Sequence, residues 1–413
     1  MRFVMWLGYI ALPLAFLSHF LLASHGPEGL RHWEPLSTFL LSGIAVIPLA
    51  NLMGTATAQL ADRTGPTWGG LLNATFGNAA ELIIAIIAMT KGLNGVVKAT
   101  LTGSILGNLL LVSGGAMVVG GWKRERQYFS KAAAQTNSAL LAVAVAAMLF
   151  PAIFHFSFRL SDRHLAEHEF GVSIGSSIVL IFIYGLGLLL TLRTHSHVFS
   201  PQPAQSPEDP AGLGQTWSIT RCVVVLLVAS VLVSLVAELL VGTVEAVATS
   251  LHWNDIFVGV ILLAIFGNAA EHSTAIMLAH RNDMDTAMAI AYQSSLQIAL
   301  FTVPFMVLLS AILVGAHVGS THQLDLIFSP MEVAAVLLTC GIVIVVGLNG
   351  ETNWFEGAML LAVYAILGIT FFYIPTARPA GYDKGTSEQP AAGPPATERV
   401  SSGQPGTWHV IAR

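Results

Sequence analysis

Eleven apolar segments of about 20 residues or more follow one another along the chain, and this feature limits the possible folds more than any other. A helix must present about 20 mostly apolar residues to cross the hydrocarbon core of a bilayer. Charged residues make up only 10% of the sequence, whereas a soluble domain carries about 25% because its surface faces water. The sequence therefore predicts an all-α integral membrane protein with about eleven transmembrane helices. The predicted spans are 3–23, 36–60, 68–90, 96–120, 133–155, 170–192, 219–242, 254–279, 285–314, 328–348 and 357–375.

The charge and the cysteines argue against several other classes of protein. The net charge is −5 and the sequence contains no basic block, so we expect a lipid bilayer and no nucleic acid as partner. Cys222 and Cys340 both lie in apolar segments, which argues against a disulfide framework and a zinc cluster. The sequence does not indicate an oligomeric state.

Polar stretches divide the chain into five parts. We expect an N-terminal transmembrane helix and loop over 1–35, two halves of five helices over 36–194 and 219–376, a flexible cytoplasmic linker over 195–218, and a disordered polar tail over 377–413. The first apolar segment is long for a signal peptide and lacks a small-residue cleavage site, so we interpret it as a transmembrane helix.

Lys and Arg are unevenly distributed between the two sides of the predicted membrane. Loops on the side of the N-terminus carry nine of these residues, and loops on the opposite side carry five, apart from four in the tail. Positively charged loops tend to stay in the cytoplasm. We therefore expect a multi-pass protein with a cytoplasmic N-terminus in the plasma membrane, which is the inner membrane in a bacterium.

An internal repeat relates the two halves of the chain. Residues 72–81 and 262–271 share eight of ten residues at an offset of 190 positions. The same offset superposes the five spans of the first half on the five spans of the second. Because five is an odd number, the second copy must enter the membrane from the opposite side. The sequence therefore predicts inverted repeats with the first helix outside them, an architecture found in many secondary transporters.

Each copy of the repeat carries one glutamate in the middle of an apolar span, Glu81 in the first and Glu271 in the second. A carboxylate at membrane depth costs at least a few kcal/mol, so it is usually neutralised, paired or bound to a ligand. Asn78 and Asn268 precede these glutamates by three residues, which places amide and carboxylate on one helix face. We expect the two faces to meet at one site near the middle of the membrane. The alternative is that both Glu/Asn pairs are hydrogen-bonded struts between helices.

The predicted site suits a hard cation. Gly77 and Gly267 let the backbone bend and can free carbonyl oxygens as further ligands. Calcium takes about six to eight oxygen ligands, whereas zinc and copper prefer imidazole and thiolate, and only His272 offers either here. We therefore predict Ca2+ as a transported substrate and no cofactor. Emptying a buried carboxylate pair of metal favours its protonation, and loading metal expels the protons, which would couple the two ions.

Further polar residues in the following spans could complete this site. Ser104 and Asn108 in the first copy, and Ser294 with Gln297 in the second, lie about one helical turn apart. Their oxygen atoms suit cation ligands or partners of the glutamates, but such residues also serve ordinary helix packing in membranes, so both interpretations stay open.

Two more glutamates lie in the seventh span. Glu238 and Glu245 are seven residues apart, which predicts one helix face and a path for protons or cations, although Glu245 also fits a position at the membrane surface. Glu332 in the tenth span has no counterpart, and we assign it no role.

One motif points to a different class of protein. His164, Glu167 and His168 fit the H-x-x-E-H pattern of zinc proteases, which needs a helix that directs both histidines to one metal. The motif lies in a short polar loop without an obvious third ligand, so an intramembrane metalloenzyme is the weaker hypothesis and we expect no enzyme.

The signature segments resemble a known family. Residues 77–82 read Gly-Asn-Ala-Ala-Glu-Leu and residues 267–272 read Gly-Asn-Ala-Ala-Glu-His, similar to the paired signatures of cation/proton exchangers (CAX), the calcium/proton antiporter branch of the calcium/cation antiporter superfamily. The resemblance covers about 36–375. It implies an eleven-helix fold with two inverted five-helix repeats, in which the two signature glutamates bind Ca2+ in exchange for H+. The residues that it implies for this site are Glu81 and Glu271, supported by Asn78, Asn268, Ser104, Ser294 and Gln297.

The chain departs from the family pattern at several positions. Ala58 and Gln59 stand where acidic residues are frequent, the linker has only Glu208 and Asp209, and Phe266 is bulkier than expected. Sodium-driven relatives carry serine and proline in their signatures, and this chain does not, which favours protons as the counter-ion. We therefore predict a secondary transporter that exports Ca2+ from the cytoplasm against H+. The alternatives are exchange of Na+, K+ or Mn2+ on the same fold, and a passive cation channel.

Overall fold

A computed structural model describes the chain over residues 2–25, 33–64, 69, 72, 75–158, 165–194, 217–316 and 323–375. His164 of the zinc-protease motif, nearly all of the linker 195–218 and the tail 377–413 lie outside these described residues. Helices dominate the described residues, which also contain two short strands, as expected for an all-α membrane protein.

The elements of the first half are α1 (Arg2–His25), α3 (Glu34–Thr64), α5 (Ala79–Thr90), α6 (Asn94–Leu106), the π-helical turn η1 (Gly107–Val112), α7 (Ser113–Gly121), β1 (Gln127–Tyr128), α8 (Lys131–Phe158), α9 (Leu165–Leu189) and the π-helical turn η2 (Leu190–Thr194). Those of the second half are α11 (Ile219–Gly242), α12 (Val244–Leu251), α13 (Asp255–Phe257), η3 (Val258–Leu263), α14 (Ala264–His280), α15 (Met284–Gln297), η4 (Ile298–Thr302), α16 (Val303–Gly315), α17 (Pro330–Gly347), β2 (Glu351–Thr352) and α18 (Trp354–Phe372).

The helices match the eleven predicted spans one for one. Within the described residues, nine helices or continuous helical runs are long and apolar enough to cross a membrane, and two shorter apolar helices, Met5–Leu21 and Ala79–Thr90, complete the set. The prediction of about eleven transmembrane helices is therefore confirmed. Within the described part of the third span, a turn at Gly77 and Asn78 interrupts the helix, and α5 begins at Ala79.

Helix boundaries reproduce the offset of 190 residues. Helix α5 ends at Thr90 and α14 ends at His280, and α6 and α15 begin at Asn94 and Met284. The turns between them also agree, since Gly92 and Asn282 have positive φ angles of 77° and 68°. This left-handed conformation suits glycine and, among other residues, asparagine best. The two copies therefore share local structure as well as sequence.

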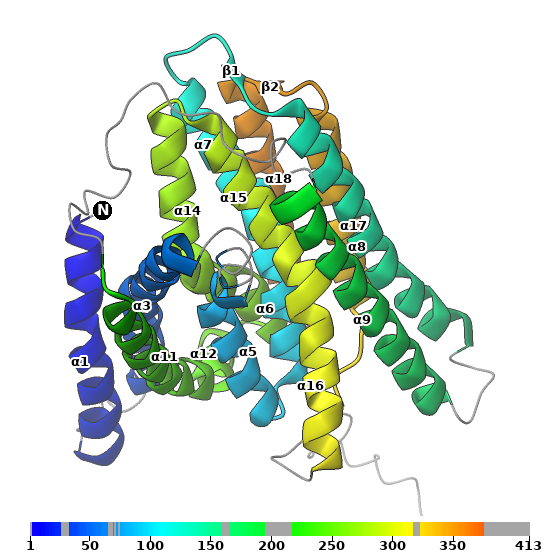
Figure 1. The fold of residues 1–413 in the computed structure, drawn as a ribbon. Helices are drawn as coiled ribbons and strands as arrows, with labels where there is room; N and C mark the ends of the chain where they lie inside the picture. Colours follow the sequence, from blue (N-terminus) through cyan, green and yellow to red (C-terminus); the bar gives the residue numbers. More distant parts are fainter. Residues whose placement is uncertain are drawn as a thin grey trace, which may run out of the picture. The chain divides into compact units, whose positions relative to one another are not determined.

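The packing of the helices follows the same symmetry. Helix α7 packs against α18 and its counterpart α16 against α9, while α8 packs against α15 and its counterpart α17 against α6. The pair α3 and α11 and the pair α8 and α17 each join a helix to its own counterpart. In Figure 1, α6 and α7 run in the direction opposite to α15 and α16. These relations are those of inverted repeats; the domain boundaries 36–194 and 219–376 stay predictions.

Successive spans run in alternate directions, so helix ends gather on two sides. We call the side where α1 begins the N-terminal side, and the other the opposite side. On the N-terminal side, β1 and β2 form an antiparallel pair that joins the α7–α8 and α17–α18 connections. On the opposite side, Asn254 Nδ2 donates to the carbonyl of Phe371 at 2.8 Å and Lys98 Nζ lies 2.5 Å from Asp325 Oδ1.

Aromatic side chains mark both ends of α18. Trp354 meets Trp122 edge-to-face at 6.1 Å on the N-terminal side, and Phe372 meets Phe257 at 5.2 Å on the opposite side. The 19 residues of this helix rise about 28 Å, close to the thickness of about 30 Å of a hydrocarbon core. Interfacial aromatic residues are typical of membrane proteins. The protein is therefore a multi-pass membrane protein whose two faces carry the loops.

Candidate functional site

Glu81 lies in the first turn of α5 and is buried, with 3% of its surface exposed. The helix starts two residues earlier, directly after the turn at Gly77 and Asn78. Asn78 occupies the cap position with φ −105° and ψ 34°, and its carbonyl accepts from the backbone N–H of Leu82 at 3.1 Å. The turn at Gly77 and Asn78 therefore fixes the position of the Glu81 carboxylate, because it determines where α5 begins.

Gly267 of the second signature faces Glu81 of the first. A Cβ atom placed at Gly267 would lie 3.2 Å from Cγ of Glu81 and 3.7 Å from its Oε1. This distance is tighter than most Cβ contacts in proteins, so glycine favours the close approach. The charges of Glu81 and Glu271 are also close enough to interact. The structure thus brings the two predicted signature segments together.

Asn268 connects the second signature to the first repeat. Its Nδ2 atom donates to Ser104 Oγ at 2.8 Å, and Asn108 Nδ2 donates to Asn268 Oδ1 at 3.3 Å. Asn268, Ser104 and Asn108 are all buried. Ser104 of α6 and Asn108 of η1 therefore lie beside the signature of the other repeat.

Glu271 has a partner from its own repeat. Ser294 Oγ on α15 donates to Glu271 Oε2 at 2.5 Å. A hydrogen bond of this length to a carboxylate is charge-assisted and strong. Gln297, the last residue of α15, is half-buried.

Two buried amide groups offer unused oxygen atoms. Asn78 is 2% exposed and both polar atoms of its side chain lack a hydrogen-bond partner, as does Oδ1 of Asn108. A buried polar group without a partner costs about 1–3 kcal/mol, so it calls for an explanation such as a ligand. In the described residues, three or more His, Cys, Asp or Glu side chains do not gather around a common point. A cation here would thus combine two carboxylates with amide and hydroxyl oxygens.

A one-residue turn separates the two glutamates of the predicted path along the seventh span. The helix is interrupted at Thr243, so Glu238 lies on α11 and Glu245 on α12. Both are exposed, and Glu238 Oε1 pairs with Lys91 Nζ at 2.6 Å. The path for protons or cations along this span stays a prediction.

Glu332, which we left without a role, has a structural one. Its Oε2 accepts from the backbone N–H of Ser329 while Ser329 Oγ accepts from the N–H of Glu332, a capping box that begins α17. Thr102 also donates to Glu332 Oε1 at 3.3 Å. A Ser three residues before Glu is a sequence signal for this cap.

Of the zinc-protease motif, Glu167 and His168 are exposed on α9.

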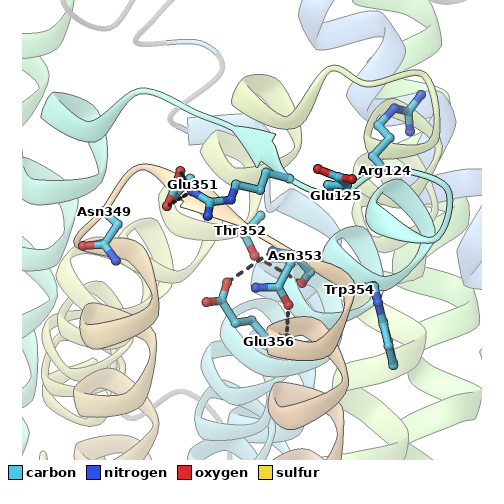
Figure 2. Close-up of a pocket in the computed structure, with 9 residues that line it drawn as sticks. Arg124, Glu125, Asn349, Glu351, Thr352, Asn353, Trp354 and Glu356 are labelled. Carbon is cyan, nitrogen blue, oxygen red and sulfur yellow. Dashed lines mark hydrogen bonds and ion pairs between the residues drawn. The ribbon is translucent and has the colours of Figure 1, made fainter.

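A polar cavity of about 350 Å³ lies elsewhere, on the N-terminal side beside β1 and β2. Two of its carboxylates are already engaged: Arg126 Nη1 lies 3.0 Å from Glu351 Oε1, and Glu356, labelled with Asn353 in Figure 2, accepts from the backbone N–H of Asn353 at 3.2 Å. Glu351 raises the pKa of the Arg126 guanidinium through this contact. The cavity therefore belongs to the joint between the two halves, not to the buried carboxylates.

The fold and the buried site together define a multi-pass membrane protein whose two inverted halves share a pair of carboxylates. The chain belongs to the sodium/calcium exchanger protein family, which matches residues 35–193 and 222–373. The resemblance seen in the signatures is thereby confirmed.

Similar proteins cover nearly the whole chain. The Ca2+/H+ antiporter of Aphanothece halophytica is 40% identical over 374 residues, 88% of this chain and 95% of that protein. The Ca2+/H+ antiporter ChaA of Bacillus subtilis is 41% identical over 346 residues, 84% of this chain and 94% of that protein. The structure of native YfkE aligns with a TM-score of 0.72 at 36% identity, covering 90% of this chain and all of that one.

Proposed function

We propose that this chain is a secondary transporter that exchanges Ca2+ for H+ by alternating access and carries Ca2+ out of the cytoplasm. The observation that carries the proposal is the close approach of Glu81 to Gly267, which joins the two signature segments at one buried place. The names of the relatives, Ca2+/H+ antiporters at about 40% identity, support the same activity. They are transporters, which favours transport over an enzymatic reaction.

The chemistry of the proposed site follows from charge balance. Two ionised carboxylates, Glu81 and Glu271, neutralise one divalent cation, and two protons neutralise them when the cation has left. A buried pair of ionised carboxylates without a bound cation is costly, because like charges repel strongly where water is excluded. Loading Ca2+ therefore releases protons, and binding protons releases Ca2+.

Neutral oxygens complete the proposed cation shell. Calcium needs more ligands than two carboxylates provide, and Asn78 supplies a buried amide that has no other partner. Gly77 and Gly267 keep the backbone close to the glutamates. In this proposal, further oxygens come from Asn268, Ser104, Asn108, Ser294 and Gln297.

The opposite side carries the exposed carboxylates of Glu238 and Glu245. In this proposal they attract protons and cations to the mouth of the path, and the Lys91 ion pair limits how much charge Glu238 presents. We place the protein in the plasma membrane, which is the inner membrane in a bacterium. Its N-terminal side faces the cytoplasm. Lys123, Arg124 and other basic residues of the α7–α8 connection lie on that side.

Uptake into proteoliposomes tests the proposed activity. Vesicles that hold the wild-type chain should accumulate radioactive Ca2+ when a pH gradient is imposed, and a protonophore should abolish the accumulation. Uptake that persists without the gradient would indicate a channel. If the same gradient drives uptake of Na+, K+ or Mn2+ but not of Ca2+, that cation is the substrate instead of Ca2+.

A further inference from the structure

Phe266 of α14 lies in a notch on α3. A Cβ atom placed at Gly43 would come within 2.5 Å of two ring carbons of Phe266, a distance that real side chains do not reach. Phe39, one turn earlier on α3, meets the Phe266 ring edge-to-face at 5.9 Å. Phe39 and Gly43 are buried. The aromatic ring therefore fits into α3 because position 43 has no side chain.

This contact lies between the carboxylates and one side of the membrane. Helix α14 runs toward the N-terminal side, so Phe266 precedes Glu271 by five residues on the way from the opposite side. Helix α3 begins on the opposite side at Glu34, and Gly43 lies in its first half. The ring thus joins α3 to the signature helix between the site and the opposite side.

The other repeat does not reproduce this notch. At the offset of 190 residues, Phe266 corresponds to Phe76, but Gly43 corresponds to Val233 and Phe39 to Ala229. A valine has no space for a ring where glycine has it. Both repeats therefore have the phenylalanine, but only α3 has a glycine at the position that receives the ring.

A second contact on the same side is also without a counterpart. Lys91, at the end of α5, pairs with Glu238 of α11 at 2.6 Å. The corresponding positions are Arg281 and Pro48, which cannot form an ion pair. Since α3 and α11 pack against each other along their length, these two contacts fasten this pair of helices to both signature helices on the opposite side.

We infer that Phe266, seated against Gly43, is the gate that closes the transport path toward the opposite side. Opening that side requires α3 to move away from α14, and the ring must leave its notch when this happens. On the N-terminal side, the positions that correspond to Gly43 and Phe39 are Val233 and Ala229, so Phe76 has no equivalent contact. The chain is therefore biased toward closure on the opposite side, and this inference rests on the transport function proposed above.

Accessibility of a cysteine behind the gate tests this inference without relying on transport. The reporter is Ala270→Cys, which lies four residues from Phe266 on the same helix face, one turn closer to the carboxylates. The native cysteines are replaced in Cys222→Ala and Cys340→Ala. A membrane-impermeant thiol reagent is applied from the opposite side of oriented vesicles that hold the full chain, without Ca2+ or a pH gradient.

Phe266→Ala should raise the rate at which this reporter cysteine is modified from the opposite side by about three- to tenfold, because the loss of an aromatic contact shifts the population toward the open state. Gly43→Val should have a similar effect, because the new side chain expels the ring. Adding Gly43→Val to Phe266→Ala should change little more, since both act on one contact. Phe76→Ala is the matched control and should leave the rate within about twofold of wild type.

Equal modification rates in Phe266→Ala and wild type would overturn the gate, and so would an equal increase in Phe76→Ala. If Gly43→Val does not fold, Phe266→Ala and Phe76→Ala still decide the question. If wild-type vesicles fail to exchange Ca2+ for H+ while the contrast in accessibility holds, the proposed function is wrong and the gate stands.

Discussion

Glu81 of the first repeat lies against Gly267 of the second, where an added Cβ atom would lie only 3.2 Å from Cγ of Glu81. This relationship gives a physical reason for the glycine that precedes Asn-Ala-Ala-Glu in the second segment. One glutamate requires the glycine of the other copy as its neighbour. The site is therefore a product of the repeat, and it exists only where the two halves meet.

Gly267→Ala should reduce Ca2+/H+ exchange by about threefold to tenfold, because the new methyl group makes Glu81 shift by a few tenths of an ångström and small displacements of a reactive group are costly. The measurement is the initial rate of Ca2+ uptake in proteoliposomes at matched protein content. Gly341→Ala is the control, since a Cβ at that position of α17 meets open space. A Gly267→Ala rate equal to the control would mean that Glu81 is not held by this contact.

Ser294→Ala should weaken the apparent affinity for Ca2+ by about tenfold, because its hydroxyl stabilises the ionised form of Glu271 that binds the cation. The neighbouring Ser295 provides a matched control. Its hydroxyl donates to the carbonyl of Ala291 within the same helix at 2.9 Å, so Ser295→Ala should leave the affinity nearly unchanged. Concentration dependence of uptake measures both variants, and equal affinities would contradict the role of Ser294.

Ca2+ binding to the purified protein should weaken as the pH falls, because protons compete for Glu81 and Glu271. Binding should also release protons. Titration calorimetry in two buffers with different ionisation enthalpies measures this release directly. We expect less release from Glu81→Gln than from wild type. Binding that is independent of pH and of the buffer would separate the cation from the proton and contradict the charge balance proposed here.

Two ion pairs on opposite sides of the protein, Lys98–Asp325 and Arg126–Glu351, should differ in their effect on stability. Lys98 is mostly buried and contacts both Asp325 and the carbonyl of Ile327 at 2.8 Å. Lys98→Met leaves these partners unsatisfied and should cost about 1–3 kcal/mol, seen as a lower apparent melting temperature in detergent. Arg126 is exposed, and exposed pairs contribute little. Arg126→Gln should leave the melting temperature close to wild type, and a larger loss than in Lys98→Met would reverse this ranking.

Hydropathy and the repeat predict most of this fold. Eleven apolar segments and an offset of 190 residues anticipate the spans, and a Gly or Asn of positive φ ends each signature helix at the same offset. Local sequence could not predict that the same letters, Gly-Asn-Ala-Ala-Glu, form a turn and a helix start at Asn78 but lie inside a continuous helix at Asn268. Tertiary packing decides between these conformations.

The partners within the site were also beyond the reach of the sequence. Helical spacing indicates which residues share a face, but the hydrogen bond from Asn268 to Ser104 crosses from one repeat to the other. The turn at Thr243, directly after Gly242, places Glu238 and Glu245 on two helices, which helical spacing alone does not predict. Phe266 was noticeable as a large residue, whereas its notch at Gly43 depends on how α3 and α14 pack.

The central claim is that Glu81 and Glu271 together carry Ca2+ and protons. The most direct test compares Glu81→Gln and Glu271→Gln with Glu125→Gln, an exposed loop carboxylate outside the site, in pH-driven Ca2+ uptake at equal reconstitution. We predict that either signature variant abolishes uptake and that Glu125→Gln transports like wild type. Substantial gradient-driven uptake by Glu81→Gln or Glu271→Gln would contradict the claim.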